Sequence, residues 1–238
     1  MSPPLPPDAR TAPADLRIAR LRLAYDTPRG PHTVVDGFDL ALPAGRIGCL
    51  LGPSGCGKST VLRAIAGFEP VREGEIHVGE RLVSSPTVHV PPEARQVGLM
   101  FQEYALFPHL DAAGNVGFGL RRLPRAARRQ RVREMLALVG LGDMAGRYPH
   151  ELSGGQQQRI ALARALAPAP ALILLDEPFS NLDGATRERL TAEVRDILRA
   201  AGQTAVLVTH NAAEARAMAD FVGVMHGGRL KDWTATQD

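Results

Sequence analysis

The chain has 238 residues, of which 45% are hydrophobic and 22% charged, which is typical of a soluble globular protein with a substantial core. Its formal net charge of only +3 favours no nucleic-acid partner, although the sequence pI is about 9.2. No apolar run approaches the roughly 18 residues of a membrane span. The two cysteines, Cys49 and Cys56, argue for a reducing compartment and against a disulfide framework.

The N-terminal stretch MSPPLPPDARTAPAD is rich in proline and has no apolar segment of the kind found in secretory signals. We therefore expect residues 1–14 to form a disordered arm.

Beyond this arm, strand and helix patterns alternate along the chain. A half-buried strand is expected at 20–25. Short apolar runs typical of buried strands follow at 47–51, 97–101, 171–175, 204–210 and 221–225. Helical patterns occupy 59–66 and 126–139. A third helix is expected after Pro178, with one apolar face that consists of Leu190, Val194, Ile197 and Leu198. A fourth is expected after Asn211, which can cap it, with support from Glu214. This alternation predicts an α/β fold on a mostly parallel sheet.

The loop after the strand at 47–51 has the pattern G-x-x-x-x-G-K-[ST], in the stretch GPSGCGKST. Glycines let successive N–H groups point toward a phosphate chain, and the helix that follows adds the positive end of its dipole. Lysine occurs only at Lys58 and Lys231, among 28 Lys and Arg residues. A slim ammonium fits between the β- and γ-phosphates, whereas the wide fork of arginine does not. The predicted phosphate-binding residues are Gly52, Pro53, Ser54, Gly55, Cys56, Gly57, Lys58, Ser59 and Thr60, with the Ser59 hydroxyl as a Mg²⁺ ligand.

A second anchor for the metal is expected where the stretch LILLDE ends. Its apolar residues carry Asp176 to the carboxyl end of a buried strand, where α/β sheets open their binding crevice. Asp176 is predicted to hold Mg²⁺ through water. Glu177 is predicted to orient and deprotonate the attacking water.

The stretch LSGGQQQR, from Leu152 to Arg159, resembles the signature of ATP-binding-cassette (ABC) ATPases. Further family motifs occur in the expected order, over essentially Leu16 to Leu230. The residues that match them are Tyr25 (adenine stacking), Gln102 (Q-loop, metal and water), Asp183 (D-loop, signalling between sites) and His210 (switch histidine, γ-phosphate).

This resemblance implies that two copies pair head to tail around ATP. Ser153, Gly154, Gly155 and Gln156 of one copy would then meet the γ-phosphate held by the phosphate loop of the other. It also implies a P-loop ABC-type domain over 15–238, with a RecA-like core at 15–101 and 156–238. An N-terminal antiparallel β subdomain belongs to that core, and a helical subdomain is inserted at about 102–155.

The stretch VPPEARQVGLMFQEYALFPHLDAAGNVGFGL is similar to importers that work with periplasmic binding proteins. The resemblance leans toward ferric-iron members, with thiamine, polyamine and sulfate as alternatives. It implies a peripheral position on the cytoplasmic face of the inner membrane and a solute-binding protein in the full complex. Membrane permease subunits are expected to contact Tyr104 to His109, where Ala105, Leu106 and Phe107 form an exposed apolar groove. This subfamily usually has a C-terminal regulatory domain, which we expect to be absent here.

Two questions stay open at this stage. The function could instead be that of a soluble ABC ATPase in DNA repair or translation, or of a module that uses ATP only to dimerise. The arginine-rich stretch from Arg121 to Arg133 could contact nucleic acid, a membrane protein, or solvent alone.

Overall fold

The structure is a computed structural model that describes residues 12–28, 30–180, 182 and 184–236. Asp183 and residues 1–11 of the proline-rich arm lie outside the described residues. The chain divides into two compact units. Of the described residues, one unit contains those from Pro13 to Glu103 and from Ala171 onward, and the other contains Tyr104–Pro170 together with Ala12.

The first unit contains a six-stranded sheet in the order β10-β9-β3-β8-β7-β6. Its strands are β3 (Ile47–Leu51), β6 (Val97–Met100), β7 (Leu172–Asp176), β8 (Ala205–Thr209), β9 (Phe221–His226) and β10 (Arg229–Ala235). The neighbours from β9 to β6 are parallel, whereas β10 pairs antiparallel with β9. The predicted mostly parallel sheet is therefore confirmed, and the carboxyl ends of β3, β7 and β8 meet at one edge.

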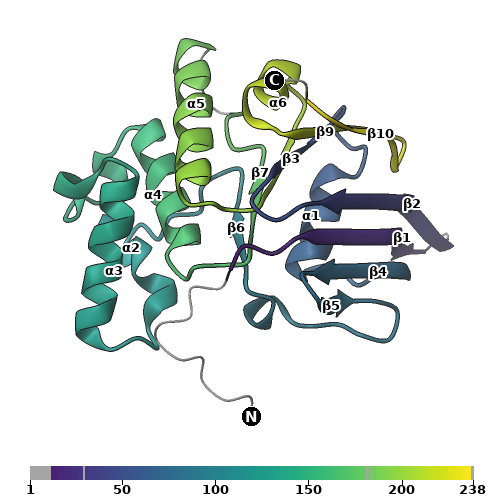
Figure 1. Cartoon of the computed structure of the whole chain (residues 1–238), viewed down its shortest axis with the longest axis horizontal. Helices are drawn as coiled ribbons and strands as arrows, with labels where there is room; N and C mark the ends of the chain where they lie inside the picture. The colour runs from purple at the N-terminus through teal and green to yellow at the C-terminus, as the bar shows by residue number, and fades with distance from the viewer. Residues whose placement is uncertain (1–11, 29, 181, 183, 237–238) are drawn as a thin grey trace. The chain divides into compact units, whose positions relative to one another are not determined.

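A second sheet in this unit is antiparallel, with four strands in the order β2-β1-β4-β5. Its strands are β1 (Leu16–Thr27), β2 (Gly30–Leu42), β4 (Glu73–Val78) and β5 (Arg81–Ser84). Figure 1 shows them as neighbouring arrows. This sheet matches the antiparallel subdomain that the family resemblance implied.

Helix α1 (Lys58–Ala66) joins the two sheets into one core, because it contacts β2 and β5 of the antiparallel sheet as well as β6, β7 and β8. Phe38, Ile65 and Leu174, from β2, α1 and β7, belong to the same buried cluster. This core fixes the start of α1 against the sheet edge where β3 and β7 end. Helix α5 (Gly184–Ala200) buries Leu190, Val194, Ile197 and Leu198, as predicted, and α6 (Ala212–Met218) packs against it.

The second unit is helical. It contains α2 (Ala112–Val116), α3 (Arg125–Leu138) and α4 (Gly154–Leu166), which contact one another (Figure 1). Short 3-10 turns connect them at Phe118–Leu120, Gly142–Met144 and Pro149–Glu151. Because α4 packs against α2 and α3, this unit extends to Pro170. The helical subdomain expected from the sequence ends at about residue 155, and its boundary stays a prediction. Among the described residues, no helix combines the length and apolar character of a membrane span.

Candidate functional site

The phosphate loop connects β3 to α1, as predicted, and its lysine is held inside the loop. Lys58 is only 4% exposed, and its Nζ donates to the carbonyl oxygens of Gly52 (2.8 Å) and Pro53 (3.0 Å). Gly57 has φ 104° and caps α1 without a side-chain hydrogen bond. A Cβ on Gly57 would approach the carbonyl oxygen of Val34 to 3.1 Å. The loop therefore requires glycine at 57, and the first turn of α1 contains no acidic side chain that would offset the positive end of the helix.

Two predicted metal ligands meet beside this loop. Asp176 is the last residue of β7, and its Oδ1 accepts a hydrogen bond of 2.8 Å from the Ser59 hydroxyl in the first turn of α1. A hydroxyl and a carboxylate are oxygen ligands that suit Mg²⁺. The described residues contain no cluster of three or more His, Cys, Asp or Glu side chains able to hold a metal. A Mg²⁺ ion at Ser59 and Asp176 would therefore complete its shell with water and phosphate oxygens.

Gln102, the third predicted ligand, lies just after β6 and is exposed. It makes no hydrogen bond with any other described residue. The structure therefore brings Ser59 and Asp176 together without joining Gln102 to them.

Glu177 and His210 form a pair at the same sheet edge, one residue beyond β7 and β8 respectively. Glu177 Oε2 lies 3.2 Å from His210 Nδ1; the side chain of Glu177 is 17% exposed and that of His210 is 56% exposed. Glu177 adopts a left-handed backbone conformation with φ 44°, and its N–H donates to the Val208 carbonyl oxygen. Such strain costs about 1–3 kcal/mol for a non-glycine residue and is concentrated at functional sites.

Tyr25 lies near the start of α1, although its hydroxyl is already bonded. Tyr25 is 38% exposed, and its hydroxyl donates to Glu69 Oε1 over 2.9 Å. Burial is the main cause that raises the pKa of Tyr25; the Glu69 carboxylate raises it further and a hydrogen bond with Thr60 lowers it. Tyr25 thus has an exposed aromatic surface close to a predicted phosphate-loop residue.

The signature residues form the beginning of α4. Ser153 Oγ accepts from the Gln156 N–H, and Gln156 Oε1 accepts from the Ser153 N–H, which makes a reciprocal capping box. Ser153 and Gly154 are exposed. The helix begins at Gly154, and its positive end faces solvent.

The expected permease-contact segment is less open than predicted. Ala105 is exposed, but Leu106 and Phe107 are half-buried, because the Phe107 ring packs on Phe118 with centroids 4.2 Å apart. Tyr104 and Ala105 both have positive φ, of 58° and 46°. Arg164 of α4 donates to both of their carbonyl oxygens, at 2.8 Å and 2.7 Å, and stabilises this unusual turn.

Sequence reasoning missed a supporting network behind His210. Glu214 is 6% exposed, accepts from the Thr209 hydroxyl, and lies 3.5 Å from Arg187 Nε. Arg187 in turn donates to the carbonyl oxygens of Phe179 and Leu182. We expected Glu214 to support the cap of α6, but its carboxylate faces these two partners, and only Asn211 caps the helix. The signal that could have found this network is the position of Glu214, an acidic residue in the first turn of a helix that directly follows a buried strand.

Comparisons with known proteins agree on one family. The family model described as ABC transporter matches residues 35–180. The spermidine/putrescine import ATP-binding protein PotA of Frankia alni is 48% identical over 95% of this chain and 48% of its own length. The Fe(3+) ions import ATP-binding protein FbpC of Streptomyces avermitilis is 51% identical over 84% of this chain and 58% of its own length. This chain thus spans about half the length of these curated relatives.

A solved structure resembles the whole chain. The ATP-binding cassette MJ0796, in a dimeric post-hydrolysis state bound to ADP and Pi, is 29% identical to this chain. The match has a TM-score of 0.79 and covers 94% of this chain and 99% of that cassette.

Proposed function

The chain belongs to the ABC transporter family, and we propose that it is the ATP-binding and ATP-hydrolysing subunit of an importer. The observation that carries the proposal is the meeting of the phosphate loop with the end of β7, where Ser59 donates to Asp176 over 2.8 Å. Backbone N–H groups, an ammonium and an oxygen pair at one sheet edge provide for a triphosphate and its metal. The similar cassette bound to ADP and Pi supports the same class of ligand.

The phosphate loop would bind ATP by exchanging partners. Lys58 now donates to the carbonyl oxygens of Gly52 and Pro53, and phosphate oxygens can replace those acceptors. The loop N–H groups and the positive end of α1 add to the attraction. Mg²⁺, held by Ser59 and Asp176 with Gln102, would supply positive charge beside the phosphate oxygens. Tyr25 would stack on the adenine.

Hydrolysis would use the Glu177–His210 pair. The oxygen of water attacks the γ-phosphorus, the bond to the bridging oxygen breaks, and ADP and phosphate result. Glu177 accepts the proton of that water, and His210, 3.2 Å away, holds the carboxylate in position. The exposed side of His210 can also donate to the γ-phosphate.

Two copies would close around ATP through the start of α4. Ser153 and Gly154 are exposed there, with the positive end of the helix, so they can meet a γ-phosphate that a second copy presents. Gly155 and Gln156 complete this surface, and Asp183 would signal between the two sites. The dimeric state of the similar cassette supports this arrangement.

The remaining partners follow from the relatives whose names include import. We infer that permease subunits contact Tyr104 to His109, that a solute-binding protein completes the complex, and that the subunit sits on the cytoplasmic face of the inner membrane. The relatives are named for spermidine/putrescine, for Fe(3+) and for trehalose/maltose, and we propose a polyamine or ferric iron as the solute. We favour ferric iron because of the motif resemblance.

The test is Glu177→Gln in the full chain, because the amide keeps the shape of the side chain but cannot accept the proton. We expect MgATP turnover to fall by about 10²–10⁴-fold while nucleotide binding is retained. A dimer that requires MgATP should then accumulate, measured by size exclusion with light scattering.

Glu188→Gln is the matched control, since Glu188 is exposed on α5, and it should change neither quantity. A Glu177→Gln variant that stays monomeric with MgATP would contradict the dimer mechanism. One that keeps normal turnover would contradict the role of Glu177. Co-purification of permease subunits in mild detergent, identified by mass spectrometry, tests the importer assignment.

A further inference from the structure

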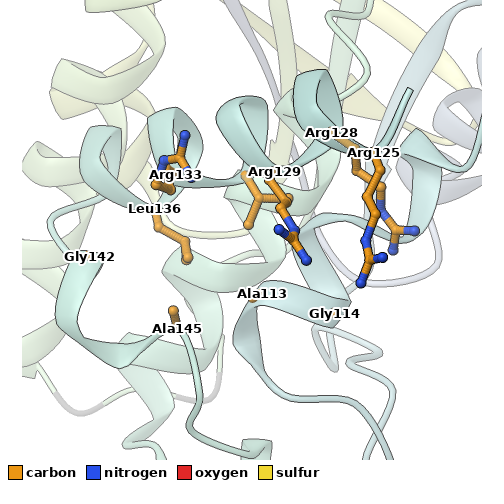
Figure 2. Close-up of a pocket in the computed structure, with 10 residues that line it drawn as sticks. Ala113, Gly114, Arg125, Arg128, Arg129, Arg133, Leu136, Gly142 and Ala145 are labelled. Carbon is orange, nitrogen blue, oxygen red and sulfur yellow. The ribbon is translucent and has the colours of Figure 1, made fainter. Parts of the chain in front are cut away.

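A hollow of about 550 Å³ lies in the helical unit, and none of the residues that line it has been assigned a role above. Its walls come from α2, α3 and the turn around Gly142, and Figure 2 shows the residues that line it. The volume is in the range of about 300–1,000 Å³ that small-molecule sites occupy. Both Ala113 and Gly114 of α2 are half-exposed, so this wall is open to a ligand.

The hollow has an end dense in positive charge and an end that is mostly apolar. Figure 2 shows the side chains of Arg125, Arg128 and Arg129 on the side of Gly114, and Leu136 and Ala145 at the other end, where Arg133 lies beside Leu136. The three arginines share one face of α3, because residues three and four apart are neighbours on a helix. A ligand suited to this space would therefore carry its negative charge at the first end and an apolar body at the second, where Arg133 is the one charged lining residue.

The positive charge at this end has no counterpart within the described part of the chain. The side chains of Arg125, Arg128 and Arg129 make no ion pair and no hydrogen bond with any described residue. Two nearby acidic side chains are used elsewhere, since Asp111 accepts from the Gly114 N–H and Glu134 lies 3.6 Å from Arg131. Asp143, next to the lining residue Gly142, is exposed and makes no ion pair with these arginines. Every ionisable residue from 121 to 133 is an arginine.

The start of α3 strengthens the same field. The helix has no acidic residue in its first turn, and Pro124 caps it without a side-chain hydrogen bond. Its positive dipole end thus adds to the charge of Arg125 and Arg128 instead of being offset. Such an arrangement is unfavourable alone and becomes favourable when an anion binds.

We propose that this hollow binds a small phosphate monoester with an apolar body. A phosphate monoester carries nearly two negative charges and three acceptor oxygens at neutral pH, which suits several arginine forks better than one carboxylate does. The apolar body would lie against Leu136 and Ala145. No aromatic side chain lines the hollow for base stacking, so a nucleic acid is disfavoured.

Butyl phosphate is the probe, because it joins a phosphate to a short apolar chain; inorganic phosphate and 1-butanol represent its two halves. The full chain, labelled with ¹⁵N, is titrated while the amide signals of Gly114, Gly142 and Ala145 are followed. We expect saturable shifts with a Kd below about 1 mM for butyl phosphate, weaker binding of phosphate and none of butanol. Signals of Gly52 and Gly55 report the phosphate loop separately, so this test does not depend on the ATPase proposal.

Three variants assign any binding to this hollow. Arg129→Gln should weaken butyl phosphate and inorganic phosphate by about tenfold or more, since it removes charge-assisted hydrogen bonds. Ala145→Leu should fill the apolar end and weaken butyl phosphate only. Arg122→Gln, an exposed arginine outside the lining, is the matched control and should change nothing. Thermal unfolding of each variant checks that it is folded.

Two results would overturn the proposal. One is the absence of saturable shifts at these amides up to about 10 mM butyl phosphate, a concentration that would reveal even weak binding. The other is arginine-dependent flotation with phosphatidylglycerol vesicles without butyl phosphate binding, which would identify a lipid surface as the ligand.

Discussion

At the carboxyl edge of the six-stranded sheet, charged side chains already have partners within the chain. Lys58 donates to loop carbonyl oxygens, Asp176 accepts from a hydroxyl, and Glu177 lies against His210. In the hollow beside α3, the side chains of Arg125, Arg128 and Arg129 have no carboxylate partner in the part of the chain that the structure describes. The difference shows two ways to prepare for an anion. At the first site the positions of the groups are set in advance, and at the second an uncompensated charge is held until the ligand arrives.

Lys58→Ala tests the paired site most severely. It removes the buried ammonium, so we expect MgATP turnover to fall by about 10²–10³-fold or more. Turnover and binding of a fluorescent ATP analogue are the measurements. Lys231→Ala, at the other lysine of the chain and exposed on β10, is the control. Unchanged turnover in Lys58→Ala would show that the phosphate loop does not depend on this ammonium, and the contrast between this site and the hollow beside α3 would fail.

Glu214→Ala tests whether the contacts of Glu214 with Arg187 and Thr209, next to the Glu177–His210 pair, stabilise the fold. The change leaves Arg187 and the Thr209 hydroxyl without their buried acceptor, so the free energy of unfolding should fall by about 2–3 kcal/mol in urea. Glu188→Ala, on the exposed face of α5, should stay within about 0.5 kcal/mol. Equal effects of the two changes would show that the network adds no stability.

Ser153→Ala removes a cap whose other role would be contact with ATP. We expect unfolding to become about 1 kcal/mol easier, measured by denaturant titration. Ser153→Asp should restore the cap, because aspartate also accepts from the helix N–H groups, yet it places a negative charge where the γ-phosphate would lie. A stable protein that fails to form the ATP-dependent dimer would separate the two roles. An Asp variant that dimerises normally would argue against the contact.

Arg129→Gln gives the smallest effect on stability. Because Arg129 has no partner among the described residues, we expect the free energy of unfolding to change by less than about 0.5 kcal/mol, in chemical denaturation. A loss as large as that in Glu214→Ala would mean that this arginine is structural, and the contrast between the two sites would fail.

The chemistry at the sheet edge could be read from the sequence because short-range rules determine it. Buried strands that end at Asp176 and Thr209 bring the residues at their ends to one edge, and the glycine pattern predicts the loop before Lys58. The Arg187–Glu214 contact depends on how two helices pack, which no local pattern reports. The arginine-rich stretch could also be identified from the sequence. That it lines a hollow could not, because the opposite walls come from α2 and Ala145, which are distant in the sequence.

The turn at Tyr104 and Ala105 gives α4 a mechanical property. Its first turn holds the exposed Ser153 and Gly154, and near its last turn Arg164 is fastened to two backbone carbonyls of this turn. Because an α-helix rises about 1.5 Å per residue and resists compression, Ser153 and Arg164 are the ends of a stiff rod about 16 Å long. A displacement of Ser153 along the helix axis would therefore either move Arg164 or break its hydrogen bonds to Tyr104 and Ala105. In this way α4 can transmit a movement from its first turn to this turn.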